Sequence, residues 1–297
     1  METDFTQRFL FAEADIRGEL VCLEESYAHV LAKHPYPEPV AVLLGEMMAA
    51  ATLLASTIKF DGLLILQATA SGAVPLLMVE CSSDHRIRAL ARYAPEHDFS
   101  AGDSLAGLMP EGLLAITIEP DRGQRYQGLV SLQGASLAEC LQEYFASSEQ
   151  LPSYFVLQAD GRRARGMLLQ QLPAEVITDE QQRQDSWQHH VTLAQTLSAE
   201  ELQGLENRLI LHRLYHQETV ELFAGRAVEF ECSCSRERSA NALASLGHAD
   251  VTQLLQEQNG RIEVDCQFCN QRYYFDAGDV TNLFAAKSEN SVQSTVH

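Results

Sequence analysis

Short apolar runs bounded by glycine, serine or proline recur through residues 1–178. Runs of this length and boundary are typical of strands. They predict strands at Leu63–Ala70, Val74–Glu80, Leu113–Glu119, Gly128–Gln133, Tyr154–Gln158 and Met167–Leu172. Helical spacing predicts helices over 40–58 and 136–147. Because strands and helices are interspersed without a strict strand–helix–strand rhythm, the pattern favours an α+β fold over a doubly wound sheet.

Residues 179–231 have a different composition, with seven glutamines, four histidines and no proline. Ser198 followed by Glu201 is a capping box at the start of a helix. Apolar side chains then recur near helical spacing, at Leu202, Leu205, Leu209, Leu211, Leu214 and Tyr215. The pattern predicts an amphipathic helical linker. Such a helix has little stability of its own, so we expect the linker to be metastable unless it packs on another surface.

The remaining residues form a short segment that contains four cysteines. Two short helices are predicted at Ser239–Leu246 and Val251–Gln258, and a small hairpin at Ile262–Val264 and Arg272–Phe275. We therefore expect an N-terminal mixed α/β domain over 1–178, the helical linker over 179–231 and a small metal-binding module over 232–287. The polar tail, 288–297, is predicted to be disordered.

The longest apolar stretch runs from Pro39 to Ile58 and carries Gly45, Glu46 and several hydroxyl side chains. It is barely long enough to cross a bilayer, and a buried core helix explains it better. The N-terminus shows acidic residues and no basic segment before an apolar run, so no signal peptide is expected. These features predict a cytoplasmic protein without a membrane partner.

Charge narrows the range of partners further. The chain of 297 residues has 21 basic and 41 acidic side chains, which gives a formal net charge of −20. A surface this acidic repels phosphate backbones and anionic lipid, so nucleic acid and membrane surfaces are not expected as partners. No nucleophile elbow, phosphate-binding loop, dinucleotide-binding glycine motif or HExxH zinc-protease motif is found, and the sequence does not predict an enzyme.

The seven cysteines fall into two groups. Cys22, Cys81 and Cys140 stand alone in apolar patterns, and we expect them to be buried, inert thiols. The other four form a CxC pair, Cys232 and Cys234, followed after 31 residues by a CxxC pair, Cys266 and Cys269. Four thiolates in two close pairs can complete a tetrahedral shell around one Zn²⁺ ion. The sequence therefore predicts a zinc site in this module.

Two interpretations of the zinc site follow from the residues. Most four-cysteine sites are structural, so the spacing alone favours a structural zinc ribbon that is indifferent to redox. The alternative function is that of a constitutive zinc-ribbon protein that binds nucleic acid or a protein partner. Nucleic-acid binding would require a basic module, but residues 232–297 hold five basic and eight acidic residues. The module has few large apolar residues, however, so the free energy of zinc binding would be its folding free energy. Oxidation of the close thiolate pairs would then eject zinc and unfold the module reversibly.

Several further segments resemble one known family. CxC followed by CxxC near the C-terminus of an acidic chain of this length resembles the bacterial redox-regulated chaperone family called heat shock protein 33. The stretches DIRGELVCLEESY, HPYPEPVAVLLGEMMAAATLLASTIKFDG, SDHRIRALAR and GRRARGMLLQQLP also look like that family's segments, in the same order. The resemblance covers nearly the whole chain.

The resemblance implies an ATP-independent holdase of the cytoplasm, inactive when reduced and activated by oxidants. It implies one Zn²⁺ bound by Cys232, Cys234, Cys266 and Cys269, and disulfides Cys232–Cys234 and Cys266–Cys269 in an oxidised homodimer. The linker would unfold with the zinc module and expose its own leucine face together with the surface it covered. We expect unfolded or oxidatively damaged client proteins to bind there, with Leu205, Leu209 and Leu214 as candidate contacts.

Overall fold

The computed structural model describes residues 3–100 and 102–284. The predicted tail, 288–297, and the last three residues of the predicted zinc module lie outside this part. The chain divides into two compact units at Glu231 and Cys232. The first unit contains two six-stranded sheets, and the described part of the second contains helices α8 and α9, a two-stranded sheet and a further helical segment over 277–284. The α+β fold class is confirmed.

The first sheet has the strand order β10-β1-β2-β9-β8, with β11 also paired to β1. Its neighbouring strands are all antiparallel. The strands are β1 (Phe5–Phe11), β2 (Ile16–Leu23), β8 (Ser153–Ala159), β9 (Ala164–Gln171), β10 (Val220–Leu222) and β11 (Arg226–Ala227).

The second sheet has the order β12-β5-β4-β3-β6-β7, in which only the short β12 runs parallel to its neighbour. The strands are β3 (Gly62–Thr69), β4 (Leu76–Ser82), β5 (Arg86–Arg92), β6 (Leu113–Pro120), β7 (Tyr126–Ser131) and β12 (Glu229–Phe230). All six strands predicted from the sequence are therefore confirmed, with shifted ends.

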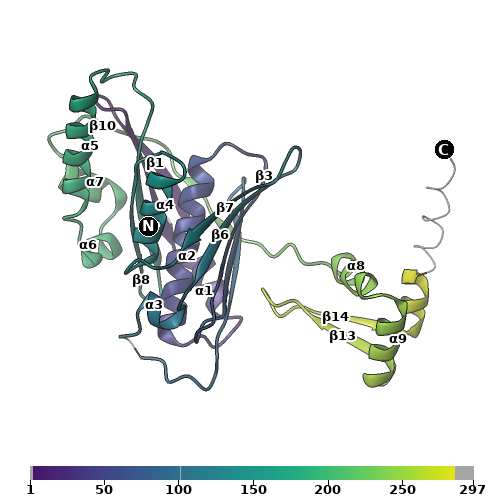
Figure 1. Ribbon diagram of the computed structural model, residues 1–297. Helices are drawn as coiled ribbons and strands as arrows, with labels where there is room; N and C mark the ends of the chain where they lie inside the picture. The colour runs from purple at the N-terminus through teal and green to yellow at the C-terminus, as the bar shows by residue number, and fades with distance from the viewer. Residues whose placement is uncertain (1–2, 101, 285–297) are drawn as a thin grey trace, which may run out of the picture. The chain divides into compact units, whose positions relative to one another are not determined.

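Helix α2 (Glu38–Thr57) is the centre of the first unit and packs against strands of both sheets. Pro37 precedes it, and an almost uninterrupted apolar sequence buries most of its length (Figure 1). It is long and apolar enough to cross a membrane by composition, but 83% of the relevant window is buried inside the fold. The expected core helix is thus confirmed. The other helices of this unit outside 179–231 are α1 (Glu25–Leu31), α3 (Leu105–Leu108) and α4 (Leu137–Ser147).

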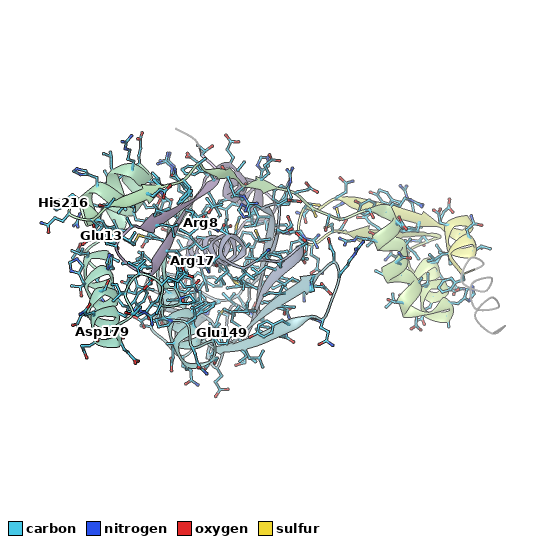
Figure 2. The ribbon with its side chains drawn as sticks, turned by 90° about the horizontal axis from the view of Figure 1, so that it is seen from above. Arg8, Glu13, Arg17, Glu149, Asp179 and His216 are labelled. Carbon is cyan, nitrogen blue, oxygen red and sulfur yellow. The ribbon has the colours of Figure 1, made fainter. Side chains whose placement is uncertain are left out.

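Three helices follow the last long strand and lie together beside β1 and β10 in Figure 1. They are α5 (Glu180–Ala194), α6 (Ala199–Gly204) and α7 (Asn207–Tyr215). The predicted capping box is present at the start of α6, where Ser198 and Glu201 exchange side-chain and backbone hydrogen bonds. Figure 2 labels Asp179, which caps α5, and His216, which follows α7, on the same flank of this unit.

The expectation that 179–231 is helical throughout is wrong for its last part. Residues 220–230 contain the short strands β10, β11 and β12 instead. These strands are too short to show a hydrophobic period, and they exist because β1 and β5 offer open edges for pairing.

The second unit contains α8 (Arg236–Leu246), α9 (His248–Glu257) and a hairpin of β13 (Arg261–Asp265) and β14 (Arg272–Asp276). The two helices and the hairpin were each predicted from the sequence. Among its described residues, the apolar cluster of the unit is small, with five buried members: Leu243, Val251, Ile262, Phe275 and Val280.

Candidate functional site

The four cysteines lie at two turns of the second unit. Cys232 and Cys234 immediately precede α8, whose first turn is capped by the Ser235 hydroxyl. Cys266 and Cys269 lie on the tight turn between β13 and β14. That turn is closed by hydrogen bonds from the backbone N–H of Cys266 to the carbonyl of Gln271 and from the N–H of Asn270 to the carbonyl of Cys266. Each pair is therefore held by local backbone structure.

The structure brings the four sulfur atoms together. All four Sγ atoms lie within 4.8 Å of one another. The Sγ atoms of Cys232 and Cys266 are 3.6 Å apart, and those of Cys234 and Cys269 are 3.4 Å apart. A tetrahedron with metal–sulfur bonds of about 2.3 Å places its sulfurs roughly 3.8 Å apart. The donor set and its spacing thus fit a single Zn²⁺ ion.

The electrostatics of the cluster also favour a cation. Burial raises the pKa of the Cys266 thiol, and the neighbouring Cys232 sulfur raises it further. The pKa of Cys269 is raised by burial and by its three sulfur neighbours. Thiolates this close repel one another, so a divalent cation among them is needed to keep all four deprotonated.

Tyr273 on β14 is a residue that the sequence analysis did not assign to the site. Its hydroxyl donates a hydrogen bond to Sγ of Cys234, at 3.2 Å, and this contact raises the pKa of Tyr273 to about 12. A tyrosine four residues after the last cysteine was the available signal, but only the register of the hairpin shows where its hydroxyl lies.

A second feature is the apolar sheet face beneath α5–α7. Phe9, Phe11, Leu20, Met167 and Leu169 of the first sheet pack against the helices in one buried cluster. The helices contribute Trp187, Val191, Ala194, Leu202, Ile210, Leu211, Leu214 and Tyr215. The linker helices therefore cover an aromatic and aliphatic surface.

The three predicted client contacts do not share one environment. Leu214 is 3% exposed and packs on the sheet, and Leu205 is partly buried against the same cluster. Leu209 is 52% exposed. Their near-helical spacing in the sequence was misleading, because α6 ends at Gly204 and Leu209 lies on the outer side of a new helix, α7.

Polar contacts hold the junction of α6 and α7 to the sheet. The guanidinium of Arg165 on β9 donates to the carbonyl of Leu205, at 2.6 Å, and to Oδ1 of Asn207, at 2.8 Å. Both Arg165 and Asn207 are buried. Arg213 on α7 also binds the Glu201 carboxylate of α6, at 2.7 Å. These bonds give the docked helices a defined register on the sheet.

The remaining candidates are structural. Cys22, Cys81 and Cys140 are buried, as predicted, and burial raises the pKa of each thiol, to about 12 for Cys81.

The two adjacent histidines of α5 have different environments. His189 is exposed and contacts Glu218 at 3.1 Å. His190, by contrast, is 3% exposed and packs edge-to-face on Phe11. Neither histidine lies in the four-cysteine cluster, which is formed from the other unit.

Comparison with known proteins places the chain in a family. A family model described as Hsp33 protein matches residues 4–276. The chain belongs to the Hsp33 family. It is 63% identical to the 33 kDa chaperonin of Pseudomonas paraeruginosa over 99% of both chains. It is 64% identical to the 33 kDa chaperonin of Pseudomonas syringae, over 99% of this chain and 98% of that one.

The fold has a relative among solved structures. The crystal structure of the 33 kDa chaperonin (heat shock protein 33 homolog) of Thermotoga maritima matches with a TM-score of 0.81 and 22% identity. The match covers 96% of this chain and 99% of that one. The resemblance noted in the sequence is thus confirmed at the level of the family and of the fold.

Proposed function

We propose that this protein is a redox-regulated, ATP-independent chaperone of the holdase type that acts in the cytoplasm. The names of its Hsp33-family relatives support a chaperone role. The observation that carries the redox part is the convergence of four cysteine sulfurs in a unit whose apolar cluster, among the described residues, has five buried members. A unit with so little core depends on its metal to remain folded.

In the reduced state, Cys232, Cys234, Cys266 and Cys269 hold one Zn²⁺ ion. The metal would supply the charge that keeps the four sulfurs deprotonated and close together. Thiolates are also the form that peroxide attacks. Each pair transfers two electrons to one molecule of hydrogen peroxide, forms one disulfide bond, and leaves two molecules of water after uptake of two protons. A sulfur in a disulfide no longer binds zinc as a thiolate, so oxidation releases the metal.

The disulfides proposed for the oxidised form are Cys232–Cys234 and Cys266–Cys269. In the folded unit close sulfur contacts also join Cys232 to Cys266, at 3.6 Å, and Cys234 to Cys269, at 3.4 Å. Local pairing is favoured once the unit has unfolded, because cysteines two or three residues apart meet far more often than cysteines more than thirty residues apart.

Loss of the zinc unit then releases the linker. Residues 229–231 pair with β5 directly before Cys232, so unfolding that begins at the cysteines reaches the linker strands without an intervening spacer. Release of α5–α7 bares the sheet face that contains Phe9, Phe11 and Met167. Exposed apolar surface of this kind binds the apolar segments of unfolded or oxidatively damaged clients, and pairs two oxidised copies into a homodimer.

The test is an aggregation assay monitored by light scattering, with a thermally unfolding client and parallel measurement of released zinc. Peroxide treatment should release one Zn²⁺ per chain and convert an inactive protein into one that suppresses aggregation. A quadruple cysteine-to-serine variant controls for peroxide acting elsewhere. Equal suppression by the reduced, zinc-loaded protein would contradict the switch and favour a constitutive zinc-ribbon protein. A reduced protein without zinc would contradict the metal assignment.

A further inference from the structure

The outer edge of β1 is covered entirely by the segment that precedes the zinc unit. β10 pairs with Phe9, Leu10 and Phe11, and β11 pairs with Phe5 and Thr6. In Figure 1, β10 lies beside β1. Between and beyond these pairs, Phe223 donates to the carbonyl of Arg8, Val228 to that of Asp4, and Ala12 to that of Thr219. Residues 219–228 therefore take up the hydrogen-bonding edge of the whole strand.

These bonds show which backbone groups of β1 face residues 219–228, which we call the cover. The residues concerned are Asp4, Arg8 and Ala12, so the even-numbered residues of β1 turn their N–H and C=O groups outward. The odd-numbered residues turn theirs toward β2, because successive residues of a strand point to opposite edges. The outward and inward amides of one strand can thus be distinguished by residue number.

The cover is weak in itself. β10 has three residues and β11 has two, and most of their side chains are exposed or only partly buried. Val228 is the one fully buried side chain among the described residues 219–228. By contrast, β1 pairs with β2 over six residues. Strand pairs this short depend on their surroundings, so the cover is stable only while the neighbouring linker helices and zinc unit are folded.

β1 is unsuited to remain uncovered. Its sequence, FTQRFLF, contains no lysine and no proline, the residues that usually protect permanent sheet edges. Its Phe9 and Phe11 side chains belong to the apolar face that α5–α7 cover. Removal of 179–231 would thus open a strand edge and an apolar face side by side, and this combination fits an extended polypeptide.

We propose that, in the active form, the outer edge of β1 binds an extended segment of an unfolded client polypeptide by β-strand addition. This inference rests on the proposed function and specifies how a client is held. The client's backbone takes the place of residues 219–228, and its alternate apolar side chains lie on the bared face. Main-chain pairing needs no particular sequence, so it suits a protein that accepts many clients.

Amide hydrogen exchange of the full-length oxidised protein, resolved by residue with NMR, tests the inference. The probe is reduced and carbamidomethylated α-lactalbumin, which stays unfolded. Oxidation should lower the protection of the outward amides of Thr6, Leu10 and Ala12 by about 100-fold or more, and the probe should restore it. The inward amides of Gln7 and Phe9 serve as the internal control and should stay protected throughout.

Two results would overturn the inference. Outward amides that remain unprotected while the probe is bound would mean that side chains alone hold the client. Outward amides that become protected in the oxidised dimer without the probe would mean that a second copy fills the edge. Failure of the oxidised protein to suppress aggregation is read separately and would count against the proposed function instead.

A pair of variants at Leu10 adds an independent test. Leu10→Pro removes one outward N–H but none of the bonds to β2, and Leu10→Ala truncates the side chain while retaining the N–H. On fully oxidised protein, Leu10→Pro should bind the probe about two- to ten-fold more weakly than Leu10→Ala, as expected for one lost backbone hydrogen bond. Equal affinities for the two variants would contradict pairing at this edge. If Leu10→Pro does not fold, the exchange experiment decides the question.

Discussion

Helix α7 offers two leucines that are chemically identical but differently placed. Leu214 is 3% exposed and packs against the sheet, whereas Leu209 is 52% exposed on the same helix. Leu214→Ala and Leu209→Ala therefore remove the same atoms from the same helix. Only the first change removes a contact that holds the linker to the sheet, so their difference measures that contact.

The magnitude follows from burial. Leu→Ala removes three carbon atoms, worth about 2.4 kcal/mol of transfer free energy when the side chain is fully buried. The cavity left behind raises the cost to about 2–5 kcal/mol. Since about 1.4 kcal/mol is a factor of ten, Leu214→Ala should raise the population with undocked α5–α7 roughly 30- to several thousand-fold. Leu209→Ala should change the docking free energy by less than about 0.5 kcal/mol.

Amide hydrogen exchange of α5–α7 in the reduced, zinc-loaded protein measures this population directly. The helices should exchange much faster in Leu214→Ala than in Leu209→Ala, and less peroxide should be needed to activate the first variant. Zinc content should be equal in the two proteins. If both variants exchange at the same rate, burial of Leu214 does not hold the helices, and the docking mechanism is wrong.

Four further predictions follow. Chelation of zinc from the reduced protein should remove the helix and strand signals of residues 232–284, because metal binding contributes on the order of 10 kcal/mol to folding. An NMR spectrum in which the β13–β14 hairpin persists after chelation would contradict this prediction. Tyr273→Phe removes a hydrogen bond that reduces the nucleophilicity of the Cys234 sulfur, so the variant should release zinc several-fold faster under peroxide. An unchanged rate of zinc release would contradict this prediction. Burial lowers the pKa of His190 below 6.5, so the undocked protein binds protons more readily than the docked protein. Docking of α5 should therefore weaken as the pH falls below about 6.5. Exchange of α5 amides at pH 5.5 and 7.5 checks this, and His190→Gln should reduce the difference between the two exchange rates. Leu209→Asp should leave the reduced protein unchanged and weaken suppression of aggregation by the oxidised protein, and full activity would remove Leu209 from the client surface.

The sequence alone predicted the elements whose signal is local. Helix α2 was evident because a long apolar run of helical spacing needs no partner to be recognised. The start of α6 was evident because Ser198 and Glu201 form their capping bonds within one turn. The four cysteines were assigned to one site because thiolates in CxC and CxxC pairs have few roles other than metal binding.

Only the tertiary structure decided which surfaces meet. β10, β11 and β12 have two or three residues each, too few for a hydrophobic period, and they are strands only because β1 and β5 offer them an edge. The difference between Leu209 and Leu214 likewise depends on how α7 rests on the sheet, which spacing along the chain does not encode. The sequence thus determined the four-cysteine motif and the family, whereas the covered strand edge and apolar face arise from contacts between residues about two hundred positions apart.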